Sequence, residues 1–428
     1  MLKRLGLLAI CTAPLLAGVA LQKDTLSAED EYFASKPSDP VAKLMTNIST
    51  GKVKLTWDPR TGYLPSLLKE LGIPASSQIL VFSKTSLQTA YISPENPRAI
   101  YFNDHTYLGF INGAPYVELT SVDPKLGPVF YTFQNMKVAR PAIARQTHNC
   151  TNCHSGSMTR GVPGVMARSV YAGYDGMPKL TNGTFLTTPK SPINERWGGW
   201  YVSGTHGKMR HMGNEPARGT DQDPKIDMEK GANVTDLSRY FEPDVVLTPH
   251  SDIVALMVAE QQMAIQNQIT RVNFATKNAL RDDVIYKPSE LVDGKHSAGA
   301  LSRIKNACEP LIQALLCSGE VALTSPIKGS TSFASDYAAA APKDKKGRSL
   351  GQLNLQSRVL EYSCSPMIYS SAFDGLPVEA KTQIFKRLHE ILDGKDTSKP
   401  FAHLTDQGRK AIAEILSETK PEFARSAN

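Results

Sequence analysis

The sequence lacks several features that define large classes of protein. After the first twenty residues it contains no stretch of about 18 uninterrupted apolar residues, so we expect no transmembrane segment in the mature chain. It also lacks a block of Lys and Arg residues of the kind that binds nucleic acids. Charged residues make up 21% of the 428 residues, which is ordinary for a globular protein. We therefore expect a globular protein with no nucleic acid partner.

Cysteine is scarce, with six residues in the whole chain. Only one C-x-x-C pair occurs, so a zinc site built from two such pairs lacks its second half. Outside this pair and the N-terminal stretch, the remaining cysteines are Cys308, Cys317 and Cys364. Their odd number means that one stays free or pairs between chains, and a bridge between Cys308 and Cys317 remains open.

The single pair is followed directly by a histidine, giving Cys150-Thr151-Asn152-Cys153-His154. C-x-x-C-H is the attachment pattern of a c-type haem. Two thiols add to the two vinyl groups of one porphyrin, and the imidazole of the next residue is then placed under the iron. We predict one covalent haem c with its iron, held by Cys150 and Cys153, with His154 as the proximal axial ligand. A thioredoxin-like dithiol, the main alternative, would follow a βαβ pattern and would not need the histidine.

Residues 1–20 have the organisation of a signal peptide. Lys3 and Arg4 precede an apolar core of about a dozen residues, and small residues follow up to Ala20. We predict cleavage near Ala20 and a periplasmic or secreted protein. A lipid anchor at Cys11 is disfavoured, because Ile10 stands where a small residue is expected. In bacteria, haem is attached outside the cytoplasmic membrane, so the leader and the haem motif support each other.

The patterning of the rest predicts an α+β fold, with an N-terminal antiparallel β-rich part, an irregular haem-wrapping segment and an α-helical C-terminal part. The expected boundaries are 1–20 for the signal peptide, 21–40 for a flexible polar lead-in, 41–140 for the β-rich domain, 141–216 for the c-type haem-binding segment, 217–248 for a loop and 249–428 for the α-helical region.

Short runs rich in β-branched and aromatic residues predict a meander of five strands at 79–82, 99–102, 107–111, 116–119 and 129–133, with a further strand at 52–57. Apolar residues at three- and four-residue intervals predict helices at 63–71, 252–280, 302–316, 377–393 and 405–419. We expect Ser251 to cap the longest of them. The tract 324–348, rich in Ser, Ala and Lys, is typical of an exposed linker.

One protein ligand leaves the sixth position of the iron open. Methionine sulfur there raises the redox potential, imidazole gives a lower one, and an empty position permits chemistry with small oxygen species. Residues 204–214 contain two His and two Met within seven residues. We rank His211 and Met212 ahead of His206 and Met209 as distal ligands.

Two arginines follow the motif closely, Arg160 and Arg168. Either is a candidate partner for a haem propionate, and the alternative is an ordinary solvated charge. A ligating histidine also needs an acceptor for its other ring nitrogen, and the carbonyl of Pro163 is the candidate.

The chain resembles a family of exported single-haem cytochrome c-like proteins, largely uncharacterised and of the type encoded by planctomycetes. The runs that carry the resemblance are GKVKL (51–55), WDP (57–59), VFSKTSLQ (81–88), PRAIYFND (97–104), CTNCH (150–154), RWGGWYV (196–202), GTHG (204–207), RHMGN (210–214) and SDIVAL (251–256). The resemblance implies haem binding and electron transfer over nearly the whole mature chain, and it implies no substrate. Cys308 and Cys317 depart from the family pattern, so it implies no disulfide between them.

Three functions follow from these observations. The first is a periplasmic c-type cytochrome that transfers electrons to redox partner proteins, and the net charge of +7 is compatible with acidic partners. The second is a peroxidase-like haem enzyme with an open distal site, because the chain far exceeds the ~100 residues that a small carrier needs. Against it, the second haem motif of bacterial di-haem peroxidases is missing. The third is a redox sensor or docking protein.

Overall fold

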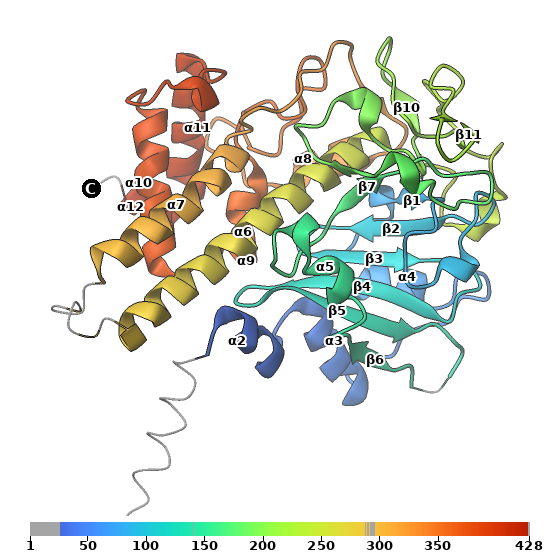
Figure 1. Cartoon of the computed structure of the whole chain (residues 1–428), viewed down its shortest axis with the longest axis horizontal. Coiled ribbons are helices and arrows are strands. Elements are labelled where there is room, and N and C mark those ends of the chain that lie inside the picture. Colours follow the sequence, from blue (N-terminus) through green and yellow to red (C-terminus); the bar gives the residue numbers. More distant parts are fainter. Residues whose placement is uncertain (1–25, 139, 287, 289–290, 292–295, 427–428) are drawn as a thin grey trace, which may run out of the picture.

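The structure is a computed structural model that describes residues 26–138, 140–286, 288, 291 and 296–426. The predicted signal peptide and Cys11 therefore lie outside the described residues. The predicted α+β fold class is confirmed at the coarse level, since an antiparallel sheet occupies the N-terminal half and helices predominate toward the C-terminus (Figure 1).

The main sheet has seven strands, all paired in antiparallel fashion. In spatial order they are β6 (Ile143–Arg145), β5 (Gly127–Gln134), β4 (Tyr116–Asp123), β3 (Thr106–Phe110), β2 (Arg98–Phe102), β1 (Ile79–Val81) and β9 (Trp200–Tyr201). The five predicted strands are confirmed as the centre of this sheet. The two additional strands at its edges come from the segment that we expected to be irregular.

The predicted strand at 52–57 is wrong. These residues have no regular structure. Every second side chain, those of Val53, Leu55 and Trp57, nevertheless packs against the hydrophobic core. The alternation therefore reflects burial of one side of an extended chain that has no strand to pair with.

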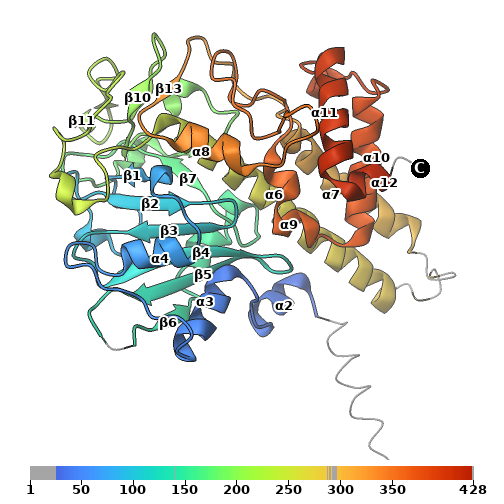
Figure 2. The same ribbon diagram turned by 180° about the vertical axis from the view of Figure 1, so that it is seen from behind.

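Helices cover both faces of the sheet. α3 (Pro40–Ser49) and α4 (Leu64–Glu70) lie on the face seen in Figure 2, and α4 confirms the helix predicted at 63–71. On the opposite face lie α6 (Ile253–Tyr286) and the short α5 (Thr151–His154) (Figure 1). Two hydrophobic clusters result, one on each side of the sheet.

The expectation of a flexible lead-in over 21–40 is wrong for its described part. α2 (Ala28–Ala34) begins at Ser27, whose side chain accepts a hydrogen bond from the Asp30 N–H. The buried Tyr32 hydroxyl donates to the carbonyl of Pro128 on β5 at 3.0 Å. Polar residues in this stretch therefore cap and attach a helix rather than keep the chain solvated.

The helix α6, with 34 residues, connects the sheet to the C-terminal helices. Asp252, rather than the predicted Ser251, caps it by accepting from the Val254 N–H at 2.8 Å. Ser251 instead donates to the carbonyl of Tyr201 on β9. The cap residue is shifted by one position because the hydroxyl is already used to hold the edge of the sheet.

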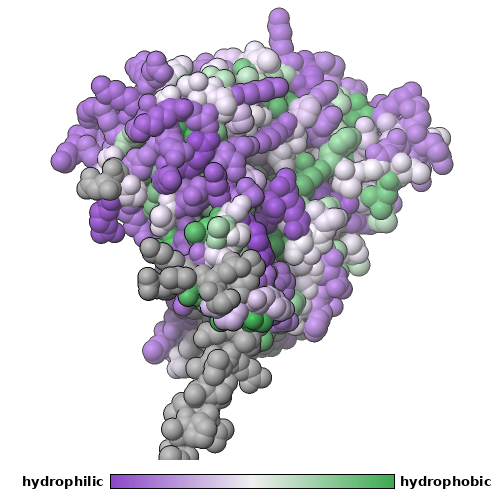
Figure 3. Space-filling view, turned by 60° about the vertical axis from the view of Figure 1, so that its left-hand side comes forward, coloured by the Kyte–Doolittle hydropathy of each residue, from purple (hydrophilic) through white to green (hydrophobic). Residues whose placement is uncertain are grey.

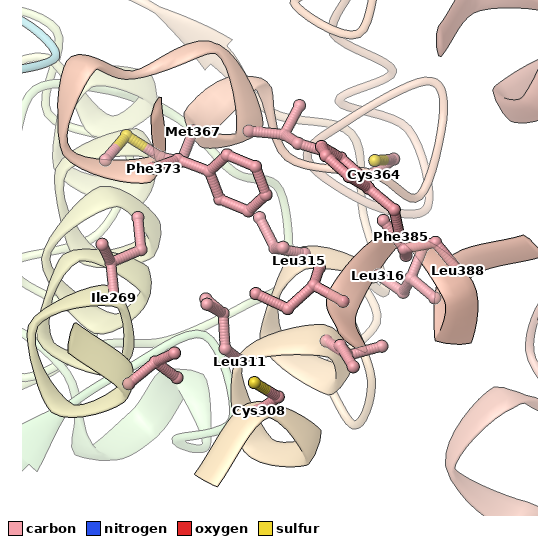
Figure 4. Packing of buried hydrophobic residues seen from close by; sticks show 14 of the residues in the cluster. Ile269, Cys308, Leu311, Leu315, Leu316, Cys364, Met367, Phe373, Phe385 and Leu388 are labelled. Atoms are coloured by element: carbon pink, nitrogen blue, oxygen red, sulfur yellow. The ribbon is translucent and has the colours of Figure 1, made fainter. Parts of the chain in front are cut away.

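The remaining predicted helices correspond to α7 (Ala298–Leu315), α10 (Val378–Leu392) and α11 (Asp406–Thr419). They pack with the shorter α9 (Ser371–Asp374) and α12 (Pro421–Arg425) on the far half of α6. Figure 4 shows this cluster, with Leu311 and Leu315 of α7 facing Phe373 and Phe385. Cys308, Cys317 and Cys364 are buried free thiols, so the bridge left open between Cys308 and Cys317 is not formed.

The tract 324–348 is not an exposed linker. It contains α8 (Phe333–Ala340), and Phe333 is 3% exposed, with its ring centroid 5.6 Å from that of Phe102. The other short strands are β7 (Ala167–Ser169) with β8 (Phe185–Thr187), β10 (Gly204–Thr205) with β13 (Lys328–Gly329), and β11 (Arg218–Gly219) with β12 (Pro224–Lys225).

The surface at the helical end is mostly hydrophilic, with separate small hydrophobic spots (Figure 3). Among the described residues, no helix has the length and apolar character that crossing a bilayer requires.

A buried ion pair attaches the chain before β9 to α6. The guanidinium of Arg196 donates to Glu260 at 3.0 Å, and the two side chains are 2% and 1% exposed. The indole N–H of Trp197 donates to the other carboxylate oxygen. Burial raises the pKa of Glu260 to about 7, and the charge of Arg196 opposes that rise. The carboxylate is thus costly to bury, and the charge of Arg196 and the hydrogen bonds from Arg196 and Trp197 favour its ionised form.

We expect Glu260→Ala to lower the free energy of unfolding by about 3–5 kcal/mol, because the variant leaves the buried Arg196 charge uncompensated. Denaturant unfolding of the two proteins measures this difference. Glu229→Ala is the matched control, because it breaks the exposed pair with Arg210 and should leave the unfolding midpoint nearly unchanged. Equal midpoints for Glu260→Ala and wild type would contradict the structural role of the pair.

Candidate haem site

The residues Cys150–His154, here named the attachment turn, form a single helical turn. The N–H groups of Cys153 and His154 donate to the carbonyl of Cys150 at 3.2 and 2.9 Å. Residues three apart lie on the same side of a helix, so the turn presents both thiols to one side. Cys150 is half-buried, Cys153 is exposed, and both are free thiols. The turn therefore has the local geometry that attachment to one porphyrin edge requires.

The imidazole of His154 is held in one tautomer. Its Nδ1 lies 2.9 Å from the carbonyl oxygen of Gly164, and a carbonyl only accepts hydrogen bonds. The proton of the neutral ring is therefore on Nδ1, and Nε2 keeps a free lone pair. Burial lowers the pKa of His154, which keeps the ring neutral. A metal-ligating histidine needs this state. The prediction placed the acceptor at Pro163, one residue before the actual one.

The acceptor is itself fixed by α6. The side-chain amide of Asn267 accepts from the Val165 N–H at 2.9 Å and donates to the Val165 carbonyl at 2.7 Å. A Cβ on Gly164 would lie 2.6 Å from Asn267 Oδ1, so only glycine fits there. Sequence reasoning missed Asn267. Its only signal was a polar residue within the most buried stretch of a long helix.

The sheet beneath the attachment turn carries a charged pair and an aromatic ring. Arg98 on β2 and Glu118 on β4 are 2.8 Å apart and partly buried, and the phenyl ring of Phe130 on β5 lies 5.0 Å from the ring of His154. Burial raises the pKa of Cys150 to about 11, with the charge of Glu118 adding to the rise. These residues were missed because they lie on three different strands and form no motif in the sequence.

The two candidate arginines lie in different surroundings. Arg160 is exposed, has a left-handed backbone with φ of 60°, and its charge lowers the pKa of Arg271 on α6, after the larger effect of burial. Arg168 lies on β7, where its Nε donates to Thr184 at 3.2 Å and its carbonyl accepts from the Trp200 indole. Arg160 and Arg271 thus form a pair of like charges. Such a pair is suited to binding an anion such as a propionate.

The two histidines of the 204–214 segment are buried, and each uses the lone pair of one ring nitrogen. The Gly213 N–H donates to Nδ1 of His211, and the Asn233 N–H donates to Nε2 of His206, both at 3.0 Å. The proton of each neutral ring is then on the other nitrogen, His211 Nε2 or His206 Nδ1. Burial lowers the pKa of His211 to about 3, so it stays neutral. Neither ring has a free lone pair to give to iron.

The two methionines of the same segment are also buried. The sulfur of Met212 accepts from the Ser169 hydroxyl at 3.7 Å, and Met209 packs in the hydrophobic cluster beside Trp197. Met212 Cε would lie 3.0 Å from a Cβ on Gly198. Both side chains therefore fill the core near β9.

The segment and the attachment turn contact α6 at different levels. The ring of His211 lies 5.2 Å from Trp197, which bonds to Glu260, whereas the loop that holds His154 bonds to Asn267. In Figure 1, α5 lies over β4 and β5, whereas β10 lies near β1 at the opposite edge. Among the described residues, the ring of His154 has no hydrogen bond or ring contact with any of the four candidate distal ligands.

The residues of the attachment turn fit covalent haem attachment with His154 as one axial ligand. Among the described residues there is no group of three or more His, Cys, Asp and Glu side chains that could hold a metal ion. The described part of the chain therefore supplies no further ligands for a zinc site at Cys150 and Cys153.

No protein-family model, curated protein or solved structure that was compared with the chain matches it. A function for the chain is therefore inferred from its residues and their geometry.

We expect Met212→Leu and His211→Gln to leave the spin state of the haem-loaded protein unchanged, because the sulfur of Met212 and Nδ1 of His211 already accept other hydrogen bonds. Absorption spectra of the oxidised and reduced proteins measure this. Met257→Leu, a buried methionine of α6 outside this segment, is the matched control. A change of spin state in Met212→Leu or His211→Gln, with Met257→Leu unaffected, would place an iron ligand in this segment after all.

Proposed function

We propose that the chain is an exported c-type cytochrome that binds one haem covalently through Cys150 and Cys153, with His154 as the proximal ligand, and transfers electrons to redox partner proteins. The observation that carries the proposal is the hydrogen bond from His154 Nδ1 to the Gly164 carbonyl. It leaves Nε2 unprotonated beside two free thiols on one helical turn. When bound, the haem supplies a one-electron iron couple.

The chain's own residues define the environment of that couple. The Gly164 carbonyl and Asn267 orient the proximal imidazole, which sets its basicity. Phe130 covers one side of the ring, and the Arg98–Glu118 pair supplies charges of both signs nearby. Arg160 and Arg271 are the proposed propionate partners. The leader and the resemblance to exported single-haem proteins support a periplasmic or secreted location.

The first test is production in a host able to mature c-type cytochromes. We expect red protein in which haem stays with the denatured polypeptide. The double variant C150A/C153A should lose all covalent haem, whereas Cys364→Ala, which removes a buried thiol elsewhere, should retain it. Colourless wild-type protein with free thiols at both positions would contradict the proposal.

A second candidate function is supported by one specific observation. Both histidines among the predicted distal ligands use a ring lone pair to accept a backbone N–H, which favours a sixth position open to small molecules and hence a haem enzyme, peroxidase-like in kind.

Carbon monoxide distinguishes the two. If the distal position is open, the reduced protein should be high-spin and its spectrum should shift on addition of the gas. A reduced low-spin spectrum that carbon monoxide leaves unchanged would favour the electron carrier, with a sixth ligand from outside the 204–214 segment. His154→Gly provides the matched control, because it should alter the starting spectrum whichever function holds.

A further inference from the structure

An ion pair lies on the face of the main sheet that carries the attachment turn. Arg98 of β2 reaches across β3 to Glu118 of β4, with 2.8 Å between Nη2 and Oε2, and the two side chains are 21% and 16% exposed. The guanidinium lies directly over Gly109 of β3, where a Cβ would stand 2.6 Å from Nη2. The glycine therefore leaves the space in which the two charges meet.

The strand register places this pair beside His154. Glu118 lies opposite Thr132 in the β4–β5 ladder, and Phe130, two residues before Thr132, points to the same face of the sheet. The ring of Phe130 lies 5.0 Å from the ring of His154. In Figure 1, α5 lies over β4 and β5 on this face. The pair is thus a neighbour of the proposed proximal ligand, on the surface of the sheet beneath the attachment turn.

The two ends of the pair act unequally on the attachment turn. Burial has the largest effect on the pKa of His154 and lowers it, and of the two charges Arg98 has a larger effect than Glu118. For Cys150, whose pKa burial raises to about 11, the order is reversed and Glu118 has the larger effect. The positive end of the pair is therefore nearer to the imidazole, and the negative end is nearer to the Cys150 thiol.

Both charges are held in place. Oε1 of Glu118 accepts from the Ser86 hydroxyl at 2.7 Å and from the Gln88 amide at 3.2 Å, while Oε2 accepts from Arg98. Burial acts to raise the pKa of Glu118, but the charge of Arg98 and these hydrogen bonds outweigh it and lower the pKa, so the carboxylate is ionised. Salt screens a partly buried pair of this kind less than it screens charges in solvent.

We propose that Arg98 and Glu118 set the reduction potential of the iron held by His154, with the positive end of the pair favouring the reduced state. This inference rests on the proposed function and adds to it the residues that adjust the couple. Reduction by one electron removes one positive charge from the iron site. A nearby cation therefore stabilises the reduced form, and a nearby anion stabilises the oxidised form.

The experiment is a redox titration, followed by absorption, of the haem-loaded mature protein and of three variants. Glu118→Gln leaves Arg98 unopposed and should favour reduction about threefold to tenfold, which raises the potential by about 30–60 mV for one electron. Arg98→Gln leaves Glu118 unopposed and should lower the potential by a similar amount. The double variant R98Q/E118Q leaves neither charge unpaired, so it avoids the folding cost of a single removal. It should lower the potential by less than Arg98→Gln does.

The double variant R60Q/D244N is the matched control, because it removes an exposed ion pair and should leave the potential at the wild-type value. Three variants with the potential of the control, single variants that shift in the same direction, or a potential of R98Q/E118Q above that of wild type would each overturn the proposal. Colourless wild-type protein would overturn the proposed function as well, whereas red protein with unshifted variants would overturn this inference alone.

Discussion

One hydrogen bond, between Nδ1 of His154 and the Gly164 carbonyl, prepares His154 to bind a metal. A neutral imidazole has one proton, and this bond decides which nitrogen carries it. The same reasoning separates His154 from the other buried histidines considered. His206 and His211 each accept a backbone N–H, so their remaining nitrogen is protonated. The three histidines thus differ in whether they can bind a metal.

The helix α6 sets the positions of the elements around this bond. Its first turn is capped by Asp252, which also accepts from the Thr331 N–H and so holds the segment before α8. Further along, Glu260 fixes the chain before β9, and Asn267 fixes the loop after the attachment turn. A buried helix with so many polar side chains is costly unless each is paired. Glu260, Gln261 and Asn267 are paired with irregular chain, and these pairs help a long segment with little secondary structure to keep its shape.

The sequence predicted the fold well where the residue pattern marks buried side chains on a segment whose backbone is also hydrogen-bonded in a strand or helix. The five central strands follow from runs of β-branched and aromatic residues, and the helix α10 follows from the spacing of its apolar residues. Prediction failed at 52–57, where alternation reported burial without a pairing partner, and at α8, whose small residues resemble a linker. The motif identified Cys150, Cys153 and His154, because covalent attachment dictates their spacing. Asn267, Arg98 and Glu118 lie far from it in the sequence and only the packing of α6 and the sheet brings them near, so no local pattern could reveal them.

The most direct measurement is the mass of the tryptic peptide that spans residues 146–160, taken from protein matured in a haem-attaching host. The account predicts that this one peptide carries the mass of one haem and has no thiol left to alkylate. The same peptide with two alkylated cysteines and no haem would contradict it.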